Sequence, residues 1–282
     1  MFTPDLLAGK RALITGGGTG LGRAMAERFL QLGATVYICG RRSGVLETTA
    51  FELEPLSPGH IHQRTCDVRD SAAVEGLLDA IWAEGPLDIL VNNAAGNFLA
   101  KTEDLSPRAF EAVIGIVLNG TVNMTLGCGR RWLAANHPGT VLNIVTTYAA
   151  SGSGSAYVVP SAIAKAGVMA LTTSLAVEWG PRGIRLNGIA PGPIPTEGAF
   201  SRLMPSPDVE KLALRRVPLR RFGTPAELAN LAAFLVSDGC TYINGDIVVM
   251  DGGEWLQGAG EFSYAGQILS DADWEAMKPK KK

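Results

Sequence analysis

Short apolar runs alternate along the chain with longer amphipathic stretches. The amphipathic stretches, such as Leu21–Leu32 and Ala72–Glu84, have the spacing of helices. Some of the short runs, such as Ile89–Val91, are apolar at every position, which is typical of strands covered on both faces. The predicted strands are Arg11–Thr15, Thr35–Cys39, Ile61–Thr65, Ile89–Asn92, Thr140–Val145, Arg185–Ile189 and Asp246–Met250. This alternation predicts an α/β fold, with a doubly wound, parallel, seven-stranded sheet flanked by helices.

The pattern predicts a single domain over residues 1–253. No internal repeat and no Pro/Gly/Ser-rich linker divides this stretch, which includes a loop at about 192–221 after the sixth strand. Residues 254–282 are expected to form a C-terminal extension. In it, Ser270 precedes a short acidic stretch and predicts the N-cap of a short helix.

A glycine-rich turn follows the first predicted strand. The segment Thr15–Gly22 reads TGGGTGLG and leads directly into a predicted helix. Glycines allow a tight turn and a close approach to a pyrophosphate, whose charge the helix N-terminus stabilises. A tight strand–helix turn alone would explain some of these glycines, but the complete strand–loop–helix context favours dinucleotide binding. The expected cofactor contacts here are Thr15, Gly16, Thr19, Gly20, Leu21 and Gly22.

The second predicted strand ends in Gly40-Arg41-Arg42. An acidic residue here would bind the adenosine ribose of NAD, whereas an arginine fork suits the 2′-phosphate of NADP. Arg41 and Arg42 therefore favour NADPH, although both could be solvated loop charges. After the third strand, Asp67 and Val68 are expected near the adenine.

The fourth predicted strand runs into Asn92–Gly96, NNAAG. Small residues there would let the backbone pass close to the cofactor, and Asn93, Ala94 and Ala95 are expected to contact it. Taken alone, the segment could be a strand-ending turn. Its occurrence together with the glycine loop favours the cofactor reading.

Composition and charge narrow the class of protein. The chain has 46% hydrophobic residues and a net charge of −2, which is typical of a globular protein with no nucleic-acid or membrane partner. Four separated cysteines without a CxxC pair and no signal-peptide pattern predict buried, reduced thiols and a cytoplasmic location. His60 and His62 lie in a polar, loop-like stretch and favour solvated side chains over a metal site. The basic tail at 278–282 is expected to be a solubilising end.

The ordered motifs resemble the short-chain dehydrogenase/reductase family over almost the whole chain. The matching elements are Thr15–Gly22, Asn92–Gly96, Asn119, Lys165, Pro191-Gly192-Pro193 and Asp251-Gly252-Gly253. Within the family, the chain is similar to the NADPH-dependent 2,4-dienoyl-CoA reductases of the mitochondrial type. The segments that carry this likeness are Asn92–Phe98, Val158–Gly167, Pro191–Ile194, Glu197–Leu203, Leu228–Leu235 and Gly260–Phe262.

One pair of positions departs from the ordinary family pattern. Reductases of this family place a tyrosine four residues before the lysine, but here Ser161 precedes Lys165. The phenol reappears as Tyr148, thirteen residues before Ser161, where a serine is usual. The mitochondrial-type dienoyl-CoA reductases show the same exchange, with a connection shorter by the two residues inserted here near Ser155-Ala156.

The exchange indicates a particular reaction. Serine is too weak an acid to protonate a ketone, so Ser161 argues against ordinary carbonyl reduction. Hydride addition at C5 of a 2,4-dienoyl thioester instead creates a dienolate, whose oxygen needs hydrogen-bond donors. The resemblance implies that Tyr148 and Asn119 donate to this oxygen, and that Lys165 binds the nicotinamide ribose with Ser161 positioning it or the cofactor. The resemblance further implies that protonation at carbon then yields a 3-enoyl-CoA, and that Pro191, Gly192 and Ile194 complete the cofactor site.

Other readings stay open at this point. Tyr148 could be a core tyrosine at a strand end, Asn119 could bridge backbone groups in a helix, and Tyr157 could be the essential phenol. We expect Tyr157 just upstream of the helix that carries Ser161, since it precedes Pro160. The alternative functions are a carbonyl or alcohol oxidoreductase, an enoyl-CoA reductase, and an inactive NADPH-binding regulator.

The loop at 192–221 is expected to cover an acyl chain and to bring arginines to the phosphates of coenzyme A. The arginines there could equally be solvated helix charges. The expected substrate contacts are Asn97, Phe98, Asn119, Tyr148, Phe200 and Arg216. The family resemblance also implies a homotetramer.

Overall fold

A seven-stranded parallel sheet forms the centre of the molecule. The computed structural model describes residues 2–149, 154–196, 206–259 and 270–276. The strand order is β3-β2-β1-β4-β5-β6-β7, so the chain winds outward in both directions from β1. The strands are β1 Arg11–Thr15, β2 Thr35–Gly40, β3 Ile61–Thr65, β4 Ile89–Asn92, β5 Gly139–Ile144, β6 Ile184–Pro191 and β7 Ile247–Met250. This confirms the predicted fold class and the seven strands, with small shifts at their ends.

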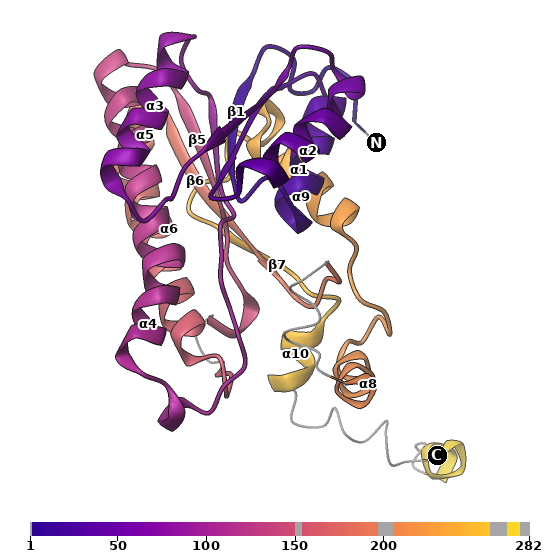
Figure 1. Ribbon diagram of the computed structural model, residues 1–282. Helices are drawn as coiled ribbons and strands as arrows, with labels where there is room; N and C mark the ends of the chain where they lie inside the picture. Colours follow the sequence, from indigo (N-terminus) through magenta and orange to yellow (C-terminus); the bar gives the residue numbers. More distant parts are fainter. Residues whose placement is uncertain (1, 150–153, 197–205, 260–269, 277–282) are drawn as a thin grey trace.

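Helices cover both faces of the sheet (Figure 1). One layer contains α1 Gly20–Gln31, α2 Ser43–Leu53 and α9 Pro225–Val236, and the other contains α3 Ser71–Ala83, α5 Gly120–Ala135 and α6 Val159–Trp179. Successive residues of β1 show why the strands are apolar throughout. Ile14 packs into the core beneath the first layer, whereas Leu13 packs into the core beneath the second.

Shorter elements join these layers. Helix α4 Pro107–Ile114 runs through a π-helical turn, η3 Gly115–Asn119, into α5. The 3-10 turns are η1 Glu54–Leu56, η2 Thr102–Asp104, η4 Thr147–Ala149, η5 Gly180–Arg182 and η6 Asp238–Cys240. Beyond the carboxyl ends of the central strands lie α8 Pro207–Arg216 and α10 Glu254–Ala259 (Figure 1).

The short C-terminal helix α12, Asp271–Ala276, begins where the sequence predicts. The Ser270 hydroxyl accepts from the Asp273 N–H at 3.3 Å, and the Asp273 carboxylate accepts from the Ser270 N–H at 2.8 Å. These reciprocal bonds confirm Ser270 as an N-cap.

The structure confirms the prediction for the cysteines but not the loop-like surroundings predicted for His62. All four cysteines are free and buried, as predicted, and burial raises the pKa of the Cys66 thiol to about 11. His62 lies in β3, as the predicted strand Ile61–Thr65 requires, and the loop-like surroundings expected for it were wrong. Its ring stacks on Tyr37 with 4.8 Å between centroids.

Candidate active site

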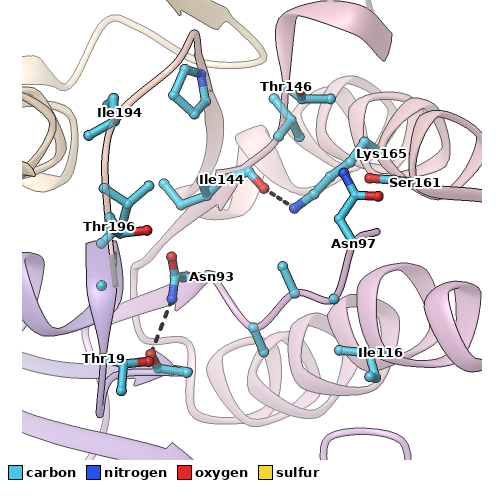
Figure 2. Close-up of a pocket in the computed structure, with 18 of the residues that line it drawn as sticks. Thr19, Asn93, Asn97, Ile116, Ile144, Thr146, Ser161, Lys165, Ile194 and Thr196 are labelled. Carbon is cyan, nitrogen blue, oxygen red and sulfur yellow. Dashed lines mark hydrogen bonds between the residues drawn. The ribbon is translucent and has the colours of Figure 1, made fainter. Parts of the chain in front are cut away.

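A cavity of about 740 Å³ opens at the carboxyl ends of the central strands. Its wall combines the glycine loop after β1, the ends of β2 to β6, the start of α6, one residue of α8 and two residues of α10. Figure 2 shows the side chains from these separate elements converging on one space. Ligands in open α/β sheets bind at this edge, where the winding of the chain reverses. Of the predicted cofactor contacts, these line the cavity: Gly16, Thr19, Gly20, Leu21, Arg41, Arg42, Asp67, Val68, Asn93, Ala94, Ala95, Lys165, Pro191, Gly192 and Ile194.

The glycine loop has the conformation that its sequence requires. Gly16 and Gly20 have φ angles of +66° and +54°, in the left-handed region that side chains avoid. Gly22 lies behind the loop, where an added Cβ would come within 2.3 Å of the Gly16 carbonyl oxygen. Gly22 thus serves the site through close packing of helix α1 against the loop, without lining the cavity itself.

Thr15 also acts from behind the cavity wall. Its hydroxyl oxygen accepts from the backbone N–H groups of Asn93 and Ala94, each at 2.9 Å, and the Asn93 amide donates to the Thr15 carbonyl at 3.0 Å. These bonds tie the end of β4 to the start of the glycine loop. A nucleotide could therefore bind across two neighbouring strand ends that these hydrogen bonds connect.

The charged rim of the cavity lies at the ends of β2 and β3. Arg41 and Arg42 both line the cavity and are exposed, so their guanidinium groups can meet a phosphate. Asp67 pairs with Arg69 at 2.5 Å. The hydrogen bonds from Arg69 hold the pKa of the Asp67 carboxyl below its usual value.

The relocated phenol lies inside the cavity. The Tyr148 hydroxyl is 3.0 Å from the Ser161 hydroxyl, and it accepts from the Asn97 side-chain amide, also at 3.0 Å. Ser161 is only 2% exposed. The two-residue insertion near Ser155 therefore leaves Tyr148 within hydrogen-bond reach of Ser161, the residue that precedes Lys165 by one helical turn.

Lys165 is buried in α6, the helix that also carries Ser161. Its ammonium group donates to the Ile144 carbonyl at the end of β5, a bond that Figure 2 marks. Burial lowers the pKa of Lys165 to about 8. One N–H of the ammonium group is used by the Ile144 carbonyl, so its other donors can bind hydroxyl groups of a ligand.

Asn119 does not line the cavity beside Tyr148 and Lys165. Its side chain is exposed, and it ends the π-helical turn Gly115–Asn119. A π turn places more residues in each turn than an α-helix and so rotates the side chains that follow. Ile116 is the residue of this turn that reaches the cavity. Asn97, which the sequence placed only among the substrate contacts, is the amide beside Tyr148.

The remaining predicted substrate contacts do not all line the cavity. Arg216 lines the cavity at the end of α8, with its Nε 3.6 Å from a carboxylate oxygen of Glu254 on α10. Phe98 packs beside the cavity, against Val113, Val117 and Ala164. Phe200 lies outside the described residues. Sequence reasoning missed Ser155, Glu254 and Trp255, which line the cavity and belong to no motif.

The fold and this site together define an oxidoreductase that uses a dinucleotide. Comparisons with known proteins agree. A family model described as enoyl-(acyl carrier protein) reductase matches residues 16–254. The chain belongs to this family, the short-chain dehydrogenases/reductases.

Three relatives illustrate the similarity. A probable 2,4-dienoyl-CoA reductase ((2E)-enoyl-CoA-producing) of Bacillus subtilis is 48% identical over 250 residues, covering 88% of this chain and 97% of that protein. A peroxisomal 2,4-dienoyl-CoA reductase ((3E)-enoyl-CoA-producing) of Danio rerio is 36% identical, covering 96% and 89%. The crystal structure of a short chain dehydrogenase from Bacillus anthracis has a TM-score of 0.79 at 44% identity, covering 87% and 96%.

These relatives support the similarity to 2,4-dienoyl-CoA reductases, but not to their mitochondrial type. The Danio rerio relative is named peroxisomal. For the cofactor, the structure of a putative 2-deoxy-D-gluconate 3-dehydrogenase from Agrobacterium tumefaciens, 33% identical with a TM-score of 0.81 over 90% of this chain and 99% of that one, contains NADP. A nicotinamide dinucleotide is therefore the cofactor class of the family.

Proposed function

We propose that this protein reduces 2,4-dienoyl-CoA thioesters to enoyl-CoA with NADPH, as a step in the β-oxidation of unsaturated fatty acids. The observation that carries the proposal is the Tyr148 hydroxyl, held at 3.0 Å by both Asn97 and Ser161 inside the cavity. The similarity to 2,4-dienoyl-CoA reductases of Bacillus subtilis and Danio rerio supports the same substrate class.

The residues present fit NADPH. Positive φ at Gly16 and Gly20 shapes a tight turn that lets a pyrophosphate approach the backbone, and Gly22 allows helix α1 to pack closely behind this turn. Arg41 and Arg42 would bind the 2′-phosphate, with Asp67 and Val68 near the adenine. Lys165 would hold the nicotinamide ribose, beside Pro191, Gly192 and Ile194. When bound there, NADPH supplies the hydride.

Tyr148 and Asn97 form the proposed site for the thioester oxygen. Because Asn97 donates to the Tyr148 hydroxyl, the phenol can donate its own proton toward the cavity. The Asn97 amide has a second N–H available for the same oxygen. Two preorganised donors would stabilise the negative charge that reaches this oxygen after hydride adds to C5.

The reaction balances with one hydride and one proton. Hydride at C5 breaks the C4=C5 double bond and leaves a dienolate over the oxygen, C2 and C4. Proton addition at C2 gives a 3-enoyl-CoA, and addition at C4 gives a 2-enoyl-CoA. We propose the 3-enoyl product. The relatives' names include both outcomes, so product analysis is part of the test.

Ser161 and Lys165 would have supporting roles. The Ser161 hydroxyl fixes the position of the phenol from the neighbouring helix.

Arg216, exposed at the mouth of the cavity, would meet a coenzyme A phosphate, and Phe98 would contribute to the acyl side. The homotetrameric assembly and the cytoplasmic location stay predictions.

A substrate panel tests the function. NADPH oxidation is followed with 2,4-hexadienoyl-CoA, a 2-enoyl-CoA and a set of ketones. We expect turnover with the dienoyl-CoA. Turnover with only ketones would identify a carbonyl oxidoreductase, turnover with only the 2-enoyl-CoA an enoyl-CoA reductase, and tight NADPH binding without turnover an inactive regulator.

Two tyrosine variants test the assignment of the phenol. Tyr148→Phe removes one donor to the oxyanion and should lower kcat for 2,4-hexadienoyl-CoA by about 10²–10³-fold. Tyr157→Phe is the matched control and should keep wild-type turnover, because Tyr157 does not line the cavity and its side chain is 58% exposed. A near-wild-type Tyr148→Phe enzyme would remove Tyr148 from the mechanism.

A further inference from the structure

Tyr157 has a backbone conformation that large side chains avoid. Its φ angle is +67°, and of the other two non-glycine residues with positive φ in the described ranges, Asn136 forms a helix C-cap of the usual kind. The Tyr157 side chain is 58% exposed, so burial of the ring does not compensate for the strain. Strained residues of this kind persist where the surrounding structure fixes them, often at functional sites.

A main-chain hydrogen bond accounts for the fixed conformation. The Tyr157 carbonyl accepts from the Ala100 N–H at 3.0 Å. Ala100 lies three residues after Asn97, in the irregular segment that follows β4. Tyr157 lies two residues before the start of α6, the helix of Ser161 and Lys165. This single bond therefore joins the segment that carries the Asn97 amide to the helix that carries Ser161.

Two further contacts transmit this position to the amide of Asn97. The Phe98 ring packs in the cluster that includes Ala164 of α6, so the segment is docked on the helix by apolar contact as well. The Phe98 N–H donates to Asn97 Oδ1 at 2.9 Å. With its oxygen held by Phe98, the Asn97 side chain directs its nitrogen to the Tyr148 hydroxyl.

We propose that Tyr157 is a positioning residue that acts through its left-handed backbone, which holds the Asn97 segment in register with α6 so that Asn97 and Tyr148 share one oxyanion site. The Tyr157 side chain is dispensable for this role. The inference rests on the proposed function for its catalytic consequence, but the link between Ala100 and Tyr157 can be measured without turnover.

Four substitutions at position 157 separate the backbone from the side chain. Glycine and asparagine adopt the left-handed region most readily, and a β-branched valine adopts it least. Tyr157→Gly and Tyr157→Asn should therefore keep wild-type kcat with 2,4-hexadienoyl-CoA. Tyr157→Val should lower kcat by roughly 10²-fold, the typical effect of misplacing a reacting group by about 1 Å. Tyr157→Phe, which changes only the hydroxyl, is the matched control and should behave as wild type.

Two measurements without turnover accompany the kinetics in the full chain. NADPH affinity should be unchanged in all four variants, because the glycine loop and Arg41 are not connected through Tyr157. Hydrogen exchange of the Ala100 amide should be slow in the wild type and in the Gly, Asn and Phe variants, and fast in Tyr157→Val. A purely structural role would lower stability without separating kcat from NADPH affinity.

The activity order decides the proposal. Retained activity and slow exchange in the Gly and Asn variants support it, and they do so even where the Val variant does not fold. An order that follows the aromatic ring, with Phe active and Gly and Asn impaired, overturns it. Fast Ala100 exchange in the wild type also overturns it. Absence of dienoyl-CoA turnover in the wild type would reject the proposed function, while the exchange of Ala100 still decides the backbone link.

Discussion

Two asparagines of this chain were expected near the substrate, and their surroundings differ sharply. Asn97 donates to the Tyr148 hydroxyl inside the cavity, whereas Asn119 is exposed outside it. We expect Asn97→Ala to lower kcat for 2,4-hexadienoyl-CoA by about 10²–10³-fold, because it removes a donor to the oxyanion. Asn119→Ala is the matched control and should keep wild-type kcat. Equal losses in the two variants would place the oxyanion site elsewhere.

The proposed preference for NADPH depends on single residues as well. Arg41 lines the cavity at the end of β2 and is exposed. If Arg41 binds the 2′-phosphate as proposed, Arg41→Asp removes a charge-assisted bond and adds a repelling carboxylate. The dissociation constant of NADPH should rise by roughly 10–100-fold, with little change for NADH. Arg108→Asp, an exposed change on α4 away from the cavity, should have no effect. Unchanged NADPH binding in Arg41→Asp would refute the assignment.

Lys165 links the site to the pH dependence of stability. Burial lowers its pKa to about 8, below the value of about 10.4 expected in the unfolded chain. Between these two pH values the unfolded state binds more protons, so this residue makes stability rise with pH over that window. Lys165→Met lacks the buried charge. Its free energy of unfolding should exceed that of the wild type by an amount that shrinks by roughly 3 kcal/mol as pH rises from below 8 to about 10.4. Denaturant titrations of both proteins measure this, and a constant difference would contradict it.

At the scale of elements, the turn between β1 and α1 depends on close packing. An alanine at position 22 would place its Cβ 2.3 Å from the Gly16 carbonyl oxygen. Gly22→Ala should therefore push the loop away from α1, lower the free energy of unfolding by roughly 1–3 kcal/mol, and weaken NADPH binding by about tenfold or more. Gly76→Ala is the matched control. It lies exposed within α3 with open space around it and should stabilise the protein by about 0.5–1 kcal/mol. Isothermal titration with NADPH and thermal unfolding distinguish the two.

The elements themselves were largely predictable from the sequence. All seven strands lie where the sequence pattern predicted them, and the central strand β4 is largely apolar because a buried parallel strand is covered on both faces. The glycine loop was predictable for a similar reason, since its positions tolerate no side chain. The largest difference is at β6, which continues to Pro191 and thus carries the strand into the cavity wall.

The arrangement around the phenol was only partly predictable. Tyr148, Ser161 and Lys165 come together as their spacing in the resembled family implied. Asn119 ends the π-helical turn Gly115–Asn119 and is exposed outside the cavity, and the sequence pattern did not predict this irregular turn. Asn97 lies in an irregular segment, and hydropathy does not predict where such a segment folds back. Glu254 and Trp255 line the cavity from α10, a short helix that belongs to no sequence motif.

At the scale of the whole molecule, residues from both halves of the sheet line the cavity. The ends of β1 to β4 and the segments after β5 and β6 all contribute to its wall. The stretches Pro107–Ala135 and Val159–Arg182 are long and apolar enough to cross a membrane by length and composition. About half of their most apolar windows, 50% and 44%, is buried inside the protein, as in core helices.

A crystal structure with NADP⁺ and a 2,4-dienoyl-CoA tests the central claim most directly. The account predicts the thioester oxygen within hydrogen-bond distance, about 2.7–3.1 Å, of both Tyr148 Oη and Asn97 Nδ2. It also predicts that C5 faces the nicotinamide ring. A thioester oxygen lying away from both donors, or against Tyr157, would contradict it.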